Sequence, residues 1–246
     1  MFTSRKTLLN MEDDGDSSVL FNSSNTYVAI GDTLNTELDS FSSFTLAFWV
    51  YVIPSSTVQT IFNVRKDSDE YLWFYENAGA ITWRFKNASD TDNVAANSAG
   101  KIPFYTWTHV ALTADGSGGS SRTCVQYNNG VAQTMSTNTT DIDITIGTAG
   151  HAQVGAINGG TSWGGYMSDI ALYGANLSAA NIVTLYNQGE YFDHNNDPNK
   201  ISNLKLWYKM GEGDGYGSNE VIDHSDSNFH GTLNNALITE FSPGDE

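Results

Sequence analysis

The chain has 246 residues, of which 28 are acidic and 11 are basic, giving a formal net charge of −17. This charge repels phosphate backbones and anionic lipid surfaces, so we expect neither nucleic-acid nor membrane binding. Hydrophobic residues make up 39% of the chain, which allows a large core, and the single cysteine, Cys124, excludes an internal disulfide. The length and composition fit one large all-β sandwich or barrel.

The first sixteen residues, 1–16, form a polar arm without the apolar segment of a signal peptide. We expect this arm to be either a frayed terminus or a tether to an assembly partner. Beyond it, short apolar runs alternate with clusters of Gly, Asn, Ser and Asp, which is typical of many strands and few helices. The strands expected in this part are 18–30, 44–52, 60–64, 70–75, 80–85, 106–113, 123–128, 141–146 and 165–173.

Two of these segments carry more specific signals. In 44–52 both alternating faces are apolar, which predicts a central strand covered on both sides. After 123–128, the residues Asn128, Asn129 and Gly130 are typical of a hairpin turn.

One segment departs from the strand pattern. Ser178 can cap a helix, Ile182, Leu185 and Tyr186 share one helical face, and Gly189 can end it. We expect one short helix of about three turns near residues 178–188.

The remainder of the chain is polar and rich in turns, with two further strand patterns. Residues 204–210 alternate between apolar and polar side chains, 211–231 have the composition of an acidic loop, and 231–237 can form a last short strand.

Five short motifs occur in a specific order: NTYVAIGD from Asn25, FTLAFWVY from Phe44, WTHVALT from Trp107, YNNGV from Tyr127 and GYMSDIALY from Gly165. Together they resemble the laminin-G-like branch of the concanavalin A-like lectin/glucanase superfamily. The resemblance implies a jelly-roll sandwich of two curved antiparallel sheets. On this basis residues 17–246 form a single domain.

The C-terminal segment, from Leu206 through LWYKMGEGDGYGSNEVIDHSDSNFHG, is similar to laminin-G-like domains in structural proteins of tailed bacteriophages. This resemblance implies a homo-oligomeric virion protein attached to capsid or tail proteins. The segment 204–237 would complete a sandwich, either its own or that of a neighbouring protomer.

Catalytic motifs are incomplete. Glucanases of this superfamily carry Glu-x-Asp-x-x-Glu on one strand, so that alternate carboxylates enter one cleft. Glu37-x-Asp39 and Glu212-x-Asp214 match only the first half of that motif. We therefore expect no enzymatic activity.

Calcium is the cofactor that the chain favours, because oxygen ligands are abundant. Asp193, Asn195 and Asp197 have the spacing of the first ligands of a calcium loop, although the later glycine and glutamate of an EF-hand are missing, and a solvated turn is the alternative. The resemblance further implies a calcium ligand at Asp169, with Asp32 and Asp223 as neighbours. The alternative is that these carboxylates cap backbone amides.

Aromatic side chains are the candidates for contact with sugars. Trp163 lies in the glycine-rich segment GGTSWGGY, which predicts an exposed loop tip. Trp73, which shares a strand face with Tyr71 and Tyr75, and Trp83, which shares one with Phe85, can belong either to a binding face or to the core between sheets.

These observations give three hypotheses of function. The first is a non-enzymatic virion decoration or fibre-associated protein of a bacteriophage, with a lectin-like fold that contacts host-surface glycans. The alternative is a secreted, extracellular bacterial carbohydrate-binding or adhesion module. The third is a degenerate glycanase.

Overall fold

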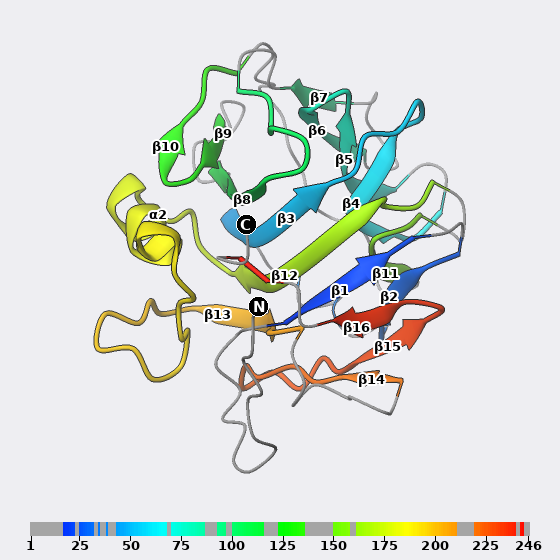
Figure 1. Ribbon diagram of the computed structural model, residues 1–246. Helices are drawn as coiled ribbons and strands as arrows, with labels where there is room; N and C mark the ends of the chain where they lie inside the picture. The colour runs from blue at the N-terminus through cyan, green and yellow to red at the C-terminus, as the bar shows by residue number, and fades with distance from the viewer. Residues whose placement is uncertain are drawn as a thin grey trace, which may run out of the picture.

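The structure is a computed structural model whose regular secondary structure is almost entirely β-strand (Figure 1). It describes residues 17–22, 25–31, 34, 38, 43–67, 70–86, 93–96, 100–115, 123–135, 150–157, 161–210, 219–239 and 242–243. The N-terminal arm 1–16 and the expected strand 141–146 lie outside these residues. The all-β class predicted from the sequence is confirmed.

The first sheet has eight antiparallel strands. Along its main path they are β10 (Val131–Ala132), β9 (Thr123–Asn128), β8 (Trp107–Asp115), β3 (Ser43–Val52), β12 (Gly165–Tyr173), β1 (Ser18–Phe21) and β16 (Leu237–Thr239). The eighth strand, β13 (Leu204–Tyr208), pairs with the C-terminal half of β12, whereas β1 pairs with its N-terminal half.

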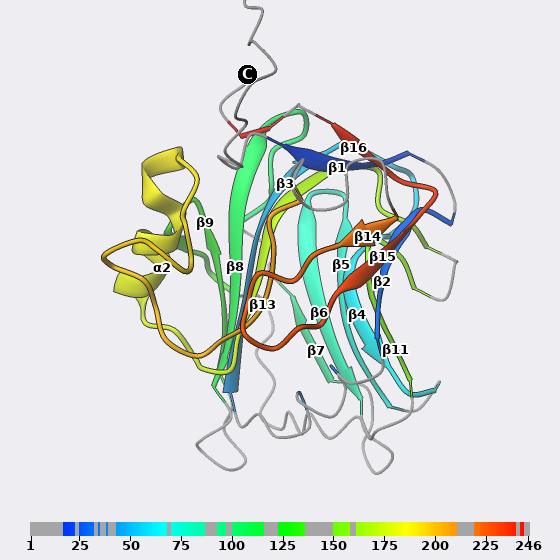
Figure 2. The ribbon, with the colours of Figure 1, turned by 90° about the horizontal axis from the view of Figure 1, so that it is seen from below.

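The second sheet also has eight antiparallel strands and faces the first (Figure 2). Their order is β14 (Glu220–Val221), β15 (Gly231–Asn234), β2 (Tyr27–Ile30), β11 (His151–Val154), β4 (Gln59–Arg65), β5 (Tyr71–Asn77), β6 (Ala80–Lys86) and β7 (Asn93–Ala96). The expected strand 18–30 is therefore two strands, β1 and β2, one in each sheet.

The main core lies between the two sheets. Strand β3 contributes Phe44, Leu46, Phe48 and Val50 to it, and each of these side chains is buried. The opposite face of β3 is also covered, so the prediction of a central strand buried on both sides is confirmed.

Helix α2 (Ala179–Tyr186) covers the outer face of the first sheet, as Figure 2 shows beside β8 and β9. Beneath it lies a second apolar cluster, in which Ile182 and Leu185 of the helix pack with Ala47, Ala111 and Ala171 of the sheet. The small alanine side chains let the helix approach the strands closely.

The helix begins as predicted and ends earlier than predicted. The Ser178 hydroxyl accepts a hydrogen bond from the Asn181 amide, as expected of an N-cap. The helix has eight residues rather than about three turns, because Asn187 adopts the left-handed conformation with φ 45°. A three-residue 3-10 turn, η1 (Asn187–Gly189), follows, so Gly189 ends that turn and not the helix.

The C-terminal segment pairs with strands of its own chain. Strand β13 pairs with β12, β15 pairs with β2, and β16 pairs with β1. In this structure the segment thus contributes strands to both sheets of one sandwich.

Candidate functional site

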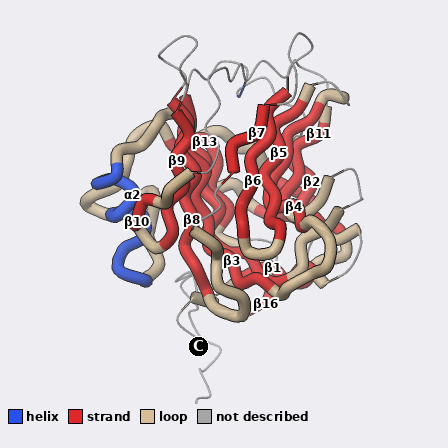
Figure 3. Tube along the Cα trace, turned by 90° about the horizontal axis from the view of Figure 1, so that it is seen from above, coloured by secondary structure: helices blue, strands red, loops and turns tan. Residues whose placement is uncertain are grey.

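The two outer faces of the sandwich differ in how they are covered. Helix α2 and the segment after it lie over the first sheet, whereas no described helix lies over the outer face of the second sheet (Figure 3). On this face the outward side chains of β5 and β6 are mostly partly exposed, whereas Thr60 and Asn63 of β4 are buried. The surface on which a ligand can lie is therefore centred on β5 and β6.

Strand β5 places a row of aromatic side chains on this face. Its buried residues Leu72 and Phe74 point into the core, so Tyr71, Trp73 and Tyr75 point outward, where they are partly exposed. The rings of Trp73 and Tyr75 lie 4.3 Å apart between centroids.

The neighbouring strand β4 fixes the position of the Trp73 indole. Its Nε1 donates a hydrogen bond of 3.1 Å to the Thr60 hydroxyl on β4. Together with the Tyr75 contact, this bond holds an apolar ring at the surface in one orientation, as stacking on a sugar requires.

The strand register surrounds these aromatic residues with polar side chains. Trp73 pairs with Asn63 of β4 on one side and with Arg84 of β6 on the other. Tyr71 pairs in the same way with Arg65 and Lys86. The pattern of the sequence could have indicated Arg84 and Lys86, since they alternate with Trp83 and Phe85 along one strand, but neither they nor Arg65 was expected as a site residue.

In the strand register, Trp73 is joined to Glu220 of β14 through Asn63, Gln153, Ala29 and Thr232. Asn63 and Gln153 are buried, and the Asn63 side-chain amide donates a hydrogen bond to the Ala156 carbonyl. The exposed part of this row is therefore interrupted between β5 and β2, and Thr232 lies about 19 Å from Trp73 at the spacing of adjacent strands.

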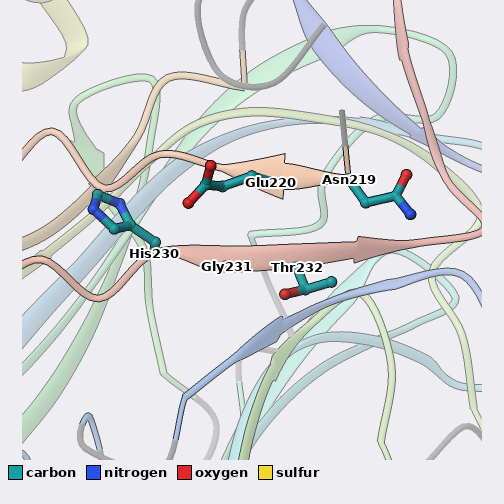
Figure 4. A pocket seen from close by; sticks show the side chains of 5 residues that line it. All are labelled: Asn219, Glu220, His230, Gly231 and Thr232. Atoms are coloured by element: carbon teal, nitrogen blue, oxygen red, sulfur yellow. The ribbon is translucent and has the colours of Figure 1, made fainter. Parts of the chain in front are cut away.

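An open hollow of about 450 Å³ lies at that far end (Figure 4). It is lined by Asn219, Glu220, His230, Gly231 and Thr232. His230 is held in place because its Nδ1 accepts a hydrogen bond of 3.0 Å from the Asp223 amide. The hollow thus adds polar groups at the edge of the same face.

The other two tryptophans expected as ligand contacts do not reach this surface. Trp83 is 0% exposed and belongs to the core between the sheets, as does Phe85. Of the two alternatives for these strands, the structure therefore places Trp73 on a face and Trp83 in the core.

The prediction of an exposed Trp163 is wrong, because the side chain is 1% exposed and packs in the main core. Its segment is pinned by a hydrogen bond from the Trp163 amide to the Gly155 carbonyl and by one from the Gly164 amide to Gln59. Gly165 lets the chain pass so close to β3 that a Cβ atom would lie 2.1 Å from the Tyr51 carbonyl oxygen. The glycines therefore fold the indole inward, away from water.

Asp169 is buried in a network of side chains beneath the segment that follows α2. One carboxylate oxygen accepts a hydrogen bond of 2.7 Å from Trp207 Nε1, and His194 Nε2 lies 3.2 Å from that same oxygen. His194 Nδ1 is in turn hydrogen-bonded to the Tyr173 hydroxyl. The backbone of Asp169 is left-handed, with φ 49°, at an irregular point of β12 that turns its side chain toward this network.

Asp223 acts as a cap within the C-terminal segment. Its carboxylate accepts hydrogen bonds from the amides of Trp207, Ser225 and Phe229 and from the Ser225 hydroxyl, at 2.8 to 2.9 Å. It therefore joins β13 to the loop before β15, which is the capping role considered as the alternative to a calcium ligand.

Asp193 and Asp197 also bond to nearby amides. Asp193 accepts from the amides of Asn195 and Asn196, and Asp197 accepts from that of Asn199. Asn195 donates its side-chain amide to the His224 carbonyl. These are the contacts of a polar turn.

The described part of the chain brings together no group of three or more His, Cys, Asp or Glu side chains that could hold a metal ion. Asp32, the third member of the expected group around Asp169, lies outside the described residues. Calcium binding stays a prediction.

The two-sheet architecture is that of a concanavalin A-like jelly roll. The family model described as the concanavalin A-like lectin/glucanases superfamily, Laminin_G_3, matches residues 22–183. The chain therefore belongs to the Laminin_G_3 family. No curated protein sequence matches the chain.

Solved structures with a similar fold share little sequence with the chain. A candidate carbohydrate-binding protein from Bacteroides ovatus has a TM-score of 0.62 and 16% identity over 93% of this chain, and the chain covers 60% of that protein's length. The CBM40 module of the Ruminococcus gnavus IT-sialidase, bound to α2,3 sialyllactose, has a TM-score of 0.53 and 13% identity over 70% of this chain and 99% of the module. A NanB sialidase variant from Streptococcus pneumoniae has a TM-score of 0.54 and 17% identity over 70% of this chain and 28% of the enzyme.

These similarities establish a lectin-like fold. None of the three structures named is a bacteriophage protein, and the virion assignment and the capsid or tail partners stay predictions. No helix in the described residues is long and apolar enough to cross a membrane.

Proposed function

We propose that this chain is a non-enzymatic glycan-binding module that binds sugars on the outer face of the second sheet. The observation that carries the proposal is the fixed, partly exposed pair of Trp73 and Tyr75 on the sheet whose outer face is not covered by a described helix. Apolar faces of sugar rings pack on such aromatic surfaces, and the partly exposed Arg84 beside Trp73 carries hydrogen-bond donors.

The similar folds support a binding role. Among them, the CBM40 module was solved with sialyllactose bound, and the Bacteroides ovatus protein is a candidate for carbohydrate binding. Because the identities are below 20%, these similarities show the fold alone. The case for sugar binding rests on the residues of this chain.

A glycosidase would need two carboxylates on opposite sides of a sugar linkage. Within the described residues, the outward positions of β11, β4, β5 and β6 carry none, and Glu220 of β14, at the far edge of the sheet, is a single carboxylate. This favours binding over hydrolysis.

Two roles are open for the chain, which differ in where it acts: an extracellular bacterial module, or a virion protein attached to capsid or tail proteins. We favour the extracellular module, because the supporting similarities are to sugar-binding proteins. Light scattering of the purified chain tests this choice, since a stable trimer or larger ring would favour the virion protein and a monomer the stand-alone module.

The binding proposal is tested on a printed array of neutral and acidic oligosaccharides, followed by titration calorimetry with the best ligand. We expect Trp73→Ala to weaken binding at least tenfold, which corresponds to about 1.4 kcal/mol. The matched control is Tyr105→Ala, which removes a 59% exposed tyrosine near Tyr51 of the first sheet.

Two outcomes would overturn the proposal. Binding that survives Trp73→Ala and is lost in Tyr105→Ala would place the site on the first sheet. An array on which the folded parent protein binds no oligosaccharide would remove glycan binding altogether.

A further inference from the structure

Three cationic side chains occupy outward positions of the second sheet, although the chain as a whole is strongly acidic. Acidic residues outnumber basic ones by 28 to 11 in the sequence. Yet the charged residues at the described outward positions of β4, β5 and β6 are Arg65, Arg84 and Lys86, and no carboxylate occurs among those positions. This group of cations on β4 and β6 is a specific local feature, because it does not follow from the acidic composition; the carboxylate of Glu220 lies at the far edge of the same sheet, on β14.

The register places these cations on both sides of the exposed aromatic residues. Arg65 on β4 and Lys86 on β6 flank Tyr71, and Arg84 lies beside Trp73. Directly paired residues have Cβ atoms about 5 Å apart, and strands β4 and β6 are about 10 Å apart, so one sugar ring on β5 is within reach of both sides.

Arg65 is the last residue of β4, and a backbone contact orients its side chain. Its Nε donates a hydrogen bond of 2.6 Å to the Asp67 carbonyl, while the side chain stays partly exposed. The planar guanidinium also carries two terminal amino groups, whose geometry matches the two oxygens of a carboxylate.

We propose that the glycan bound on this face carries a carboxylate, as sialic and hexuronic acids do. This inference rests on the proposed function and names its ligand class. The sugar ring packs on Tyr71 and Trp73, and its carboxylate pairs with the cations at their sides, Arg65 first among them. A carboxylate accepts charge-assisted hydrogen bonds from the guanidinium groups that a neutral sugar cannot match, which favours the acidic ligand.

The experiment compares matched acidic and neutral probes by titration calorimetry on the full chain. Sialyllactose is compared with lactose, and trigalacturonic acid with its fully methylated ester, so that the two pairs distinguish sialic from hexuronic acid. We expect one acidic probe to bind at least tenfold more tightly than its neutral partner, and raising the salt from 0.05 to 0.5 M to weaken only the acidic one.

Charge-removing variants test the named residues. Arg65→Gln and Arg84→Gln should each weaken the binding of the acidic probe at least fivefold more than they weaken the binding of the neutral probe. Lys209→Gln is the control, since it removes the same charge beside Trp207, outside this face. Thermal unfolding of each variant checks that it is folded.

The outcomes separate this inference from the proposed function. If Trp73→Ala weakens a neutral glycan and acidic probes bind no better than neutral ones, glycan binding stands and the carboxylate inference is overturned. Equal binding of sialyllactose and lactose 3′-sulfate would also overturn it, because any anion would then suffice. If no probe binds and the array is also empty, both proposals fail.

Discussion

At the scale of single residues, the buried polar side chains beneath the segment that follows α2 are hydrogen-bonded to one another. Asp169, His194, Tyr173 and Trp207 satisfy one another in a buried position. Buried polar groups that are fully paired fix one arrangement of the surrounding chain, whereas an unpaired one is costly. Changes at these residues should therefore act on stability.

Replacing Asp169 by alanine leaves the indole Nε1 of Trp207 and the ring of His194 without their acceptor. We expect Asp169→Ala to lower the free energy of unfolding by about 3 kcal/mol, as measured by urea denaturation. Asp226→Ala, at an exposed carboxylate of the same charge, should change it by less than about 0.5 kcal/mol.

The same pair of variants tests the calcium prediction. If calcium binds at Asp169, adding it should raise the melting temperature of the parent protein, and Asp169→Ala should abolish this response. A parent protein whose melting temperature is the same in calcium and in a chelator would contradict the calcium site.

His109 makes stability depend on pH. Burial lowers the pKa of this histidine to about 4, while the facing Asp169 carboxylate raises it and His194 lowers it. Its ring packs against Trp49 and Tyr186. Between pH 6.5 and 4 the unfolded chain therefore binds a proton here that the folded chain does not, so the free energy of unfolding decreases as the pH falls, by roughly 3 kcal/mol in total.

Urea denaturation of the parent and of His109→Phe at pH 7, 5.5 and 4 measures this contribution. The phenylalanine keeps an aromatic ring between Trp49 and Tyr186, and His109 Nδ1 has no hydrogen-bond partner among the described residues to lose. The variant should lose less stability on acidification. Parallel curves for the two proteins would show that His109 does not titrate in this range.

At the scale of elements, alternation along each strand decides which side chains a face presents. Strands β5 and β6 are adjacent, but Trp73 points outward on β5 while Trp83 points inward on β6. The register pairs Trp83 with the inward Phe74, and Trp73 with Arg84. The hairpin between these two strands fixes that register, so its turn matters for the site.

This turn contains Ala78 and Gly79, with φ 52° and 87°. The hairpin after β9 has the same left-handed pair in Asn129 and Gly130, with φ 47° and 76°, as the sequence predicted for that turn. Alanine is strained in this conformation, whereas asparagine tolerates it well.

We therefore expect Ala78→Asn to raise the free energy of unfolding by about 0.5 to 1 kcal/mol in a urea titration. Ala78→Val places a β-branched side chain at the same positive φ and should lower it. A destabilised Ala78→Asn would show that this turn does not limit the stability of the hairpin.

At the scale of the whole molecule, residues far apart in the sequence complete both sheets. The C-terminal segment supplies β13 to the first sheet and β14 and β15 to the second. It also contributes five apolar side chains to the main core: Leu206, Tyr208, Met210, Val221 and Leu233.

Removing residues 204–246 should abolish cooperative folding. Burial of an apolar side chain contributes about 2 kcal/mol, so the loss of five is comparable to the entire net stability of a domain of this size. The truncation would also expose the edges of β12 and β2, which favours aggregation. Solubility and thermal unfolding measure the effect, and a soluble truncated chain with the parent's melting temperature would show that the segment is dispensable.

Local patterns in the sequence determined much of this fold. Alternation predicted most strands and the double burial of 44–52, and turn and capping residues predicted the Asn129–Gly130 hairpin and the start of the helix at Ser178. These features depend on residues close together in the chain, so the chain itself contains the information.

Only the tertiary structure decided which face of each strand meets water. A period of two defines two faces of a strand without saying which is covered, so the sequence allowed both Trp73 and Trp83 either on a binding face or in the core. Trp163 among its glycines was wrongly expected at the surface. The antiparallel register then brought Arg65, Arg84 and Lys86 together around Tyr71 and Trp73. Because pairing between strands is non-local, the sequence pattern alone could not place these cations beside the aromatic residues.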